Sequence, residues 1–188
     1  MQCKLFKLYN QNKEETLQIF RERFGNNNII ILHPNLIAVK YRHDSCGLAL
    51  KYIFNNIHDL STSQFLFTTN NVFDVIEFFY DNGFFLTEIN YKGKVPDNHL
   101  EFIGTKIHQL NSLHQKETID NSVKKNIIAT LFKEMKWLET DGGYNLFNIR
   151  VASKNNFDSL TIYDNGIIVL EDINNINILK EFFKERRI

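Results

Sequence analysis

Stripes of large apolar residues at helical spacing recur along this chain and constrain its fold more than any other feature. Residues three and four positions apart lie on one face of a helix, so each stripe predicts a helix with one buried face. The second stripe is followed by Gly83, which predicts a left-handed helix end. The stripes are Leu17/Phe20/Phe24, Val72/Val75/Ile76/Phe79, Leu100/Ile103/Ile107/Leu110, Val123/Ile127/Leu131/Met135/Leu138 and Ile178/Leu179/Phe182/Phe183.

Other segments are typical of strands. The ranges 29–32 and 36–41 are apolar on both sides of a Pro-Asn turn, and 159–170 holds Asp-Asn-Gly between apolar runs, a hairpin pattern. Residues 4–68 then follow the order strand, helix, strand, strand, helix, strand, which is that of a ferredoxin-like unit. Because a short apolar run can be a strand or a buried helix, periodicity alone leaves all-α and α+β folds open.

The composition indicates one soluble globular domain, residues 1–188, without a linker, since only two prolines occur. A net charge of +0 gives no field that would attract nucleic acid or an anionic membrane. No apolar stretch is long enough for stable membrane insertion, and no secretory signal opens the chain. With only two cysteines, which suits a reducing compartment, we expect a cytoplasmic protein.

The sequence offers little catalytic chemistry. Cys46 follows residues that could cap a helix, and His43 or His33 could pair with its thiol. A capped helix with a half-buried cysteine explains the same residues, because no orienting group or oxyanion motif accompanies them. The six histidines lack metal-ligand spacing, and no glycine-rich phosphate loop occurs. We therefore expect no enzyme, no metal and no cofactor.

Residues 52–157 nevertheless carry a series of motifs in a suggestive order. These are Tyr52-Ile53-Phe54, Leu60 to Phe65, Val72 to Phe84, the Pro96-Asp97-Asn98-His99 turn, Leu131-Phe132 with Trp137, and Phe157. Together they resemble the TorD/DmsD/NarJ family of cytoplasmic molybdoenzyme maturation chaperones. Two details depart from the family pattern, because Asn98 separates Asp97 from His99, and Asp158 follows Phe157 where the family has an aromatic residue.

The resemblance implies an all-α, TorD-like helical bundle that acts as a chaperone without a cofactor of its own. Its partner would be the precursor of a molybdenum-dependent redox enzyme or that precursor's twin-arginine leader, bound by a monomer or weak dimer. An apolar groove would take the leader, and carboxylates would bind its arginines. The partner-binding residues that the resemblance implies are Ser61, Ser63, Phe65, Asp97, His99 and Glu101.

Two other hypotheses about the function remain open beside the chaperone. The first is a small α+β protein-interaction module, such as an immunity or inhibitor protein of a mobile element. The second is an enzyme that depends on Cys46. Under every interpretation Asp97 or Asn98 is expected to cap the helix that follows Pro96, and Asn98 with Glu101 is close to a capping box.

Overall fold

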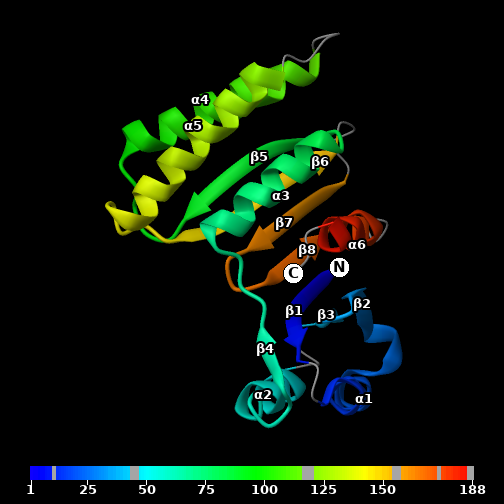
Figure 1. Ribbon diagram of the computed structural model, residues 1–188. Helices are drawn as coiled ribbons and strands as arrows, with labels where there is room; N and C mark the ends of the chain where they lie inside the picture. The colour runs from blue at the N-terminus through cyan, green and yellow to red at the C-terminus, as the bar shows by residue number, and fades with distance from the viewer. Residues whose placement is uncertain (10–11, 43–46, 116–120, 154–157, 173–174, 186–188) are drawn as a thin grey trace. The chain divides into compact units, whose positions relative to one another are not determined.

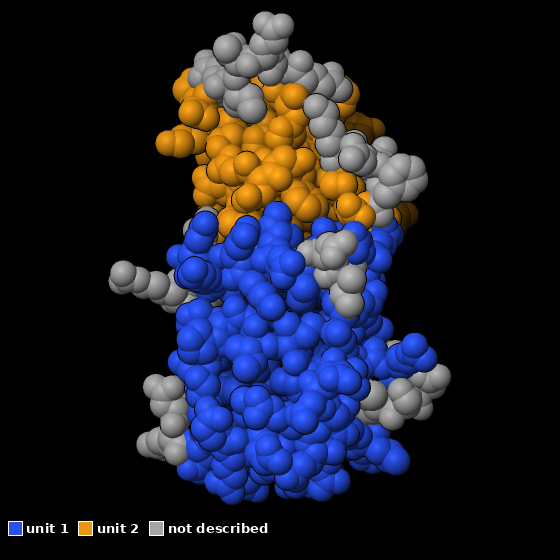
Figure 2. Space-filling model, turned by 90° about the vertical axis from the view of Figure 1, so that its right-hand side faces the viewer, with its two compact units in different colours: residues 1–66, 165–188 blue, residues 67–164 orange. Residues whose placement is uncertain are grey.

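A computed structural model describes residues 1–9, 12–42, 47–115, 121–153, 158–172 and 175–185. Helices and antiparallel strands are interleaved along them (Figure 1). They divide into two compact units: unit 1 holds residues 1–66 and 165–188, and unit 2 holds residues 67–164 (Figure 2). The single domain 1–188 stays a prediction, because compact units of one chain can fold together or separately.

Unit 1 begins with the predicted order of strand, helix, strand, strand, helix, strand, which is confirmed. Strand β1 pairs antiparallel with β3 on one side and β4 on the other, and β2 pairs with β3, so the arrangement is ferredoxin-like. The elements are β1 (Gln2–Leu8), α1 (Lys13–Phe24), η2 (Asn26–Asn28), β2 (Ile29–His33), β3 (Leu36–Lys40), α2 (Gly47–Asn55) and β4 (Thr62–Gln64), joined by β8 (Ile167–Leu170) and α6 (Asn175–Glu185).

The second edge of β1 is divided between two strands. Its first residues, Gln2–Lys4, pair with β8, and its last residues, Phe6–Leu8, pair with β4. At Leu5, between the two, the amide donates to the carbonyl of Gly166 at 2.9 Å, and the carbonyl accepts from the Phe65 amide at 3.2 Å. Both edges of β1 are therefore hydrogen-bonded along its length.

Helices α1 and α2 cover one face of this sheet. Because side chains alternate along a strand, Phe6 and Leu8 share a face, and both belong to a core cluster with residues of α1 and α2. The Phe6 ring meets the Phe20 ring of α1 edge-on at 5.1 Å between centroids. Ile53 of α2 is fully buried in the same cluster.

Helix α6 covers the opposite face. Lys7 alternates with Phe6, and its ammonium lies 5.3 Å from the centre of the Phe65 ring. That ring in turn packs edge-on against Phe183 of α6 at 5.7 Å. Strand β3 is consequently buried on both faces, which explains its uninterrupted apolar run, residues 36–39.

Unit 2 places helices against a three-stranded antiparallel sheet in the order β7-β6-β5. Helix α3 packs on β5 and β6, and α4 and α5 pack together, with α4 beside β5 (Figure 1). The elements are α3 (Thr69–Asp81), β5 (Phe84–Tyr91), α4 (Asp97–Ser112), η3 (Leu113–Gln115), α5 (Asn121–Thr140), β6 (Leu146–Ser153) and β7 (Ser159–Tyr163).

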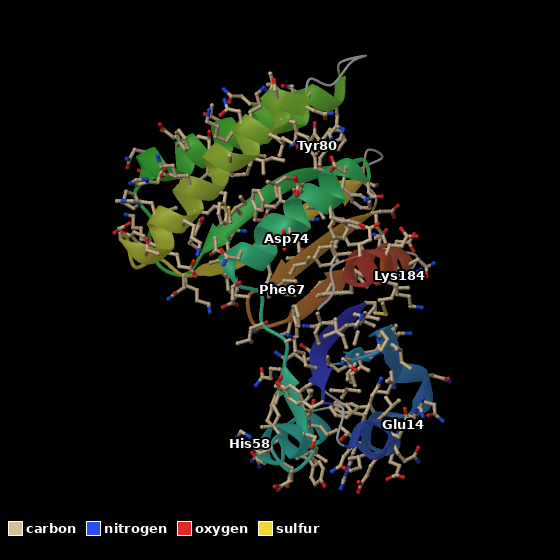
Figure 3. All side chains as sticks on the ribbon, viewed as in Figure 1. Glu14, His58, Phe67, Asp74, Tyr80 and Lys184 are labelled. Atoms are coloured by element: carbon tan, nitrogen blue, oxygen red, sulfur yellow. The ribbon has the colours of Figure 1, made fainter. Side chains whose placement is uncertain are left out.

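Side chains of unit 2 fasten its helices at one end. The ring of the buried residue Tyr80 on α3 (labelled in Figure 3) lies against the His114 ring, with 4.0 Å between the ring centroids. Lys124 of α5 binds Asp81 at the end of α3 at 2.6 Å. A capping box that sequence reasoning missed opens α3, where the Thr68 hydroxyl accepts from the Asn71 amide.

Strand β5 is an edge strand of unit 2, and an α4 side chain covers part of its open edge. The Asn111 carboxamide donates to the Leu86 carbonyl at 2.7 Å and accepts from the Leu86 amide at 3.2 Å. This pair of bonds reproduces what a neighbouring strand would offer. It therefore occupies hydrogen-bonding groups that could otherwise pair with another chain.

The predicted all-α, TorD-like bundle is wrong, because both units contain antiparallel sheets, and the alternative α+β fold with a ferredoxin-like N-terminal half is confirmed. The helices expected over 72–81, 99–113 and 123–138 are present as α3, α4 and α5, with bounds within two residues of those expected, except that α3 begins three residues earlier, at Thr69. The strands expected around Asp164-Asn165-Gly166 are also present, as β7 and β8. Of the expected buried faces, Leu100 and Val123 are exposed instead.

We predict that Gly166→Ala destabilises the protein far more than Gly83→Ala. Both glycines have positive φ, +77° and +81°, so alanine costs about 1–2 kcal/mol at either position. A Cβ at Gly166 would also lie 1.9 Å from the Phe65 carbonyl oxygen, whereas a Cβ at Gly83 meets no described atom within 4 Å. Urea unfolding should show about 1–3 kcal/mol more loss for Gly166→Ala. Equal losses would contradict the close approach.

We also predict that Asn111→Ala lowers the free energy of unfolding by about 1–3 kcal/mol, because both polar groups of Leu86 lose their partner. Gln109→Ala, on the exposed side of the same helix, serves as the control and should change stability by less than about 0.5 kcal/mol. Amide hydrogen exchange at Leu86 should accelerate in Asn111→Ala alone. Unchanged protection there would show that the carboxamide does not cover the strand edge.

Candidate functional site

The start of α4 carries three of the residues implied as partner-binding: Asp97, His99 and Glu101. Pro96 is the residue that precedes the helix, at φ −59°, and its carbonyl accepts the His99 amide at 3.1 Å. Among the described residues no side chain caps this helix, so the expected cap by Asp97 or Asn98 is wrong. Asp97 instead lies exposed in the first turn, where its charge interacts favourably with the helix dipole.

His99 is held by two residues of α5. Its Nδ1 lies 2.5 Å from a carboxylate oxygen of Glu134, and both side chains are about four-fifths buried, at 21% and 22% exposure. Its ring stacks on the indole of Trp137, with 4.8 Å between centroids and 18° between planes. One contact fixes the ring direction and the other its plane, so His99 joins the first turn of α4 to the last turns of α5.

This contact begins a line of rings on the surface of unit 2. Phe102 follows His99 by three residues, which places the two side chains next to each other on the helix. The Lys106 ammonium lies 5.3 Å from the centre of the Phe102 ring. Phe102 and Trp137 are 36% and 43% exposed. We call Trp137, His99 and Phe102 the aromatic stripe.

A cavity of about 380 Å³ lies on the β5 side of the same helix turn. Asp97 and the half-exposed Leu100 line it from α4, and Lys94 and Val95 line it from the connection before the helix. Tyr91, at the end of β5, also contributes to its wall. The first turns of α4 thus have two different sides. Asp97 and Leu100 face the cavity, and the aromatic stripe lies on the other side of the helix.

The Tyr91 hydroxyl is buried and has no hydrogen-bond partner among the described residues. Burial raises the pKa of this phenol, and the carboxylates of Glu134 and Glu139 raise it further. The hydroxyl therefore stays protonated and remains a hydrogen-bond donor throughout the physiological range. A buried donor without a partner is costly to the fold, which marks this position as one that a bound group or water would satisfy.

The groups gathered at this site are suited to binding. The described residues around α4 contain no cysteine or serine hydroxyl beside His99. Across the described ranges, no group of three or more His, Cys, Asp or Glu side chains is arranged to hold a metal ion. What the site offers is exposed rings, carboxylates and one buried donor.

The other implied residues, Ser61, Ser63 and Phe65, belong to unit 1. Ser61 has φ +45°, and its carbonyl accepts the Tyr9 amide at 2.9 Å. The Ser63 hydroxyl lies 2.9 Å from the Tyr9 hydroxyl. Phe65 is buried at 4% exposure, so it packs in the core and does not face solvent. The six residues are thus divided between the two units, and their role in partner binding stays a prediction.

Glu134 and Tyr91 are the site residues that sequence reasoning missed, and Trp137 entered only through the resemblance. Glu134 lies 35 residues after His99, and only the alignment of α4 against α5 brings them together. The one available signal was Trp137, a large aromatic residue outside the apolar stripe of its helix. The pairing of two helices at a particular alignment leaves no mark in single-sequence periodicity.

Comparison with protein-family models, curated proteins and solved structures found no match to this chain. Of the residues discussed above, His43, Cys46 and Phe157 lie outside the described ranges. No helix within the described ranges is both long and apolar enough to cross a membrane.

Cys3, the cysteine within the described ranges, is buried at 1% exposure. Burial raises the pKa of its thiol to about 11, against a smaller opposing effect of Lys40 and the amino terminus. A thiol with this pKa is protonated at neutral pH and is a poor nucleophile.

The raised thiol pKa predicts a pH dependence of stability. The folded state holds the proton more tightly than the unfolded state, so this contribution is complete below the unfolded pKa of 9.0 and is lost as pH rises to about 11. Between these values the free energy of unfolding should fall by up to about 2 kcal/mol more in wild type than in Cys3→Ala. Guanidinium unfolding at several pH values measures the difference, and parallel pH profiles would rule out this contribution.

Proposed function

We propose that this protein binds a polypeptide segment that carries an arginine beside apolar side chains, and that it does so at the aromatic stripe of unit 2. The observation behind the proposal is Trp137, which is held flat against His99 and yet is 43% exposed. Tryptophan is enriched among the residues that dominate protein–protein binding energy. Because the stack restricts the indole before any partner arrives, less conformational entropy is lost on binding.

The charges around the stripe support an arginine in the partner. The Glu134 carboxylate lies beside the stacked rings, Asp97 is exposed in the first turn of α4 on the cavity side, and Glu101 is exposed one residue after that turn. A guanidinium can stack on an indole and bind a carboxylate in its own plane, which makes this combination of groups suitable for arginine. Leu100 and Phe102 would contact the apolar neighbours of that arginine.

Two kinds of partner fit this chemistry. One is the twin-arginine leader or precursor that the chaperone hypothesis names, although the α+β fold removes the helical bundle on which that hypothesis depended. The other is the target of an immunity or inhibitor protein, and the α+β fold is the class that this hypothesis assumed. Either way we propose a binding protein without catalytic activity or cofactor, cytoplasmic, and monomeric or weakly dimeric.

Trp137 is the single tryptophan of the chain, so its fluorescence reports on this site directly. We predict that a short peptide with two adjacent arginines followed by leucine and phenylalanine changes its emission saturably. The same peptide with glutamine in place of both arginines should bind at least tenfold more weakly, because the charge-assisted hydrogen bonds are lost. Equal affinities for the two peptides would show that arginine is not recognised.

Calorimetry on variants distinguishes binding at this site from nonspecific binding. Trp137→Ala should weaken binding by about 2 kcal/mol or more, the range for a dominant interface residue. Asp97→Asn removes a charge without disturbing a cap and should cost about 1–3 kcal/mol of binding. Phe147→Ala is the matched control, because Phe147 is 40% exposed on β6 of the same unit and lies outside the stripe. Equal losses for Phe147→Ala and Trp137→Ala would count against the stripe.

A further inference from the structure

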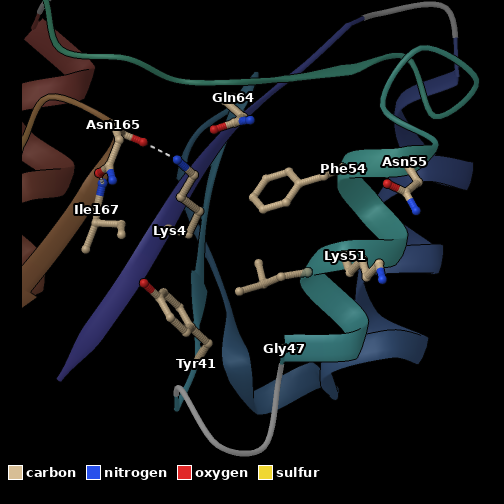
Figure 4. Close-up of a pocket in the computed structure, with 10 residues that line it drawn as sticks. Lys4, Tyr41, Gly47, Lys51, Phe54, Asn55, Gln64, Asn165 and Ile167 are labelled. Atoms are coloured by element: carbon tan, nitrogen blue, oxygen red, sulfur yellow. Dashed lines mark hydrogen bonds between the residues drawn. The ribbon is translucent and has the colours of Figure 1, made fainter.

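A second cavity, in unit 1, has a composition unlike the first. It measures about 460 Å³, within the usual range for small-molecule sites. One wall is a single face of α2, formed by residues at positions i, i+3, i+4, i+7 and i+8: Gly47, Leu50, Lys51, Phe54 and Asn55. The helix buries Ile53 in the core, and Phe54 projects from it toward Lys4 (Figure 4).

The opposite wall is the sheet. Lys4 lies in register with Ile167 of β8, and both line the cavity together with Gln64 of β4 (Figure 4). Tyr41, directly after β3, and Asn165, directly before Gly166, complete it. These residues come from four separate stretches of the chain, so the cavity exists only once unit 1 has folded.

The charges in the lining have one sign. Lys4 and Lys51 are cationic, and none of the ten described lining residues is acidic. Lys4 is 4% exposed, and its ammonium donates to the backbone carbonyl of Asn165. A largely buried positive charge such as that of Lys4 attracts an anion more strongly than one at the surface, because less water screens it.

The remaining lining residues limit the kind of anion. The rings of Tyr41 and Phe54 and the side chains of Leu50 and Ile167 offer apolar contact, and three carboxamides offer neutral hydrogen bonds. The volume exceeds that of a simple ion and is too small for a folded macromolecule. We propose that this cavity binds a small organic anion, with its carboxylate or phosphate toward Lys4 and Lys51 and an aromatic or apolar body between Tyr41 and Phe54.

This site is independent of the proposed polypeptide binding, since all its residues belong to unit 1. The test uses the full chain and two anionic probes, adenosine monophosphate and phenylacetate, each against its neutral counterpart, adenosine and phenylacetamide. Amide chemical shifts in two-dimensional NMR should move saturably around Lys51 and Phe54 with at least one anion. The neutral counterpart should bind at least tenfold more weakly.

Two variants and one control variant show where the probe binds. Lys51→Gln should weaken the anion at least threefold, whereas Lys180→Gln, an exposed lysine on α6 of the same unit, should leave its affinity unchanged. Gly47→Leu should abolish binding with the fold intact, because a Cβ there meets no described atom within 4 Å and the new side chain would fill the cavity. The proposal is overturned if neither anion gives a saturable shift, if the neutral probes bind as well, or if Gly47→Leu binds like wild type.

Discussion

The sheet of unit 1 depends on strand β1, one edge of which pairs with two different strands. Strand β1 is hydrogen-bonded to β3 along one side, and on the other it passes from β8 to β4 at Leu5. There the carbonyl of Gly166 and the amide of Phe65 meet the same residue. This junction leaves no space for a side chain on Gly166, so the backbone of three separate segments is fixed at a single point.

The junction also shapes the cavity beside α2. The turn that presents the Gly166 carbonyl to Leu5 presents the Asn165 carbonyl to the ammonium of Lys4. This bond holds the ammonium of Lys4 in the wall of the cavity that the sheet forms. A lysine side chain without such a bond would extend into solvent. A cationic cavity and a stable sheet thus have the same structural origin in unit 1.

Much of unit 1 could be predicted from the sequence, and less of unit 2. The order of elements over residues 4–68 was visible chiefly because β2 and β3 are short apolar runs on either side of a Pro-Asn turn, although β4 is entirely polar. Strand β5 was hidden, because a bulge between Leu86 and Glu88 places Thr87 and Glu88 both on the exposed side and breaks the alternation. The family resemblance then favoured an all-α fold, since its motifs fall mainly on the segments that are helical. The contact of His99 with Glu134 could not be foreseen, because it depends on how α4 and α5 align.

The division of the chain has a consequence for its synthesis. Unit 2 occupies one continuous stretch, residues 67–164, between the two parts of unit 1. Because translation runs from the N-terminus to the C-terminus, all of unit 2 is synthesised before β8 and α6. Strand β1 is made before unit 2 and waits with half of one edge unpaired until residues 167–170 emerge, and an unpaired strand edge favours association with other chains. Unit 1 is thus begun before unit 2 and completed after it, so during synthesis the edge of β1 that pairs with β8 is exposed to other chains.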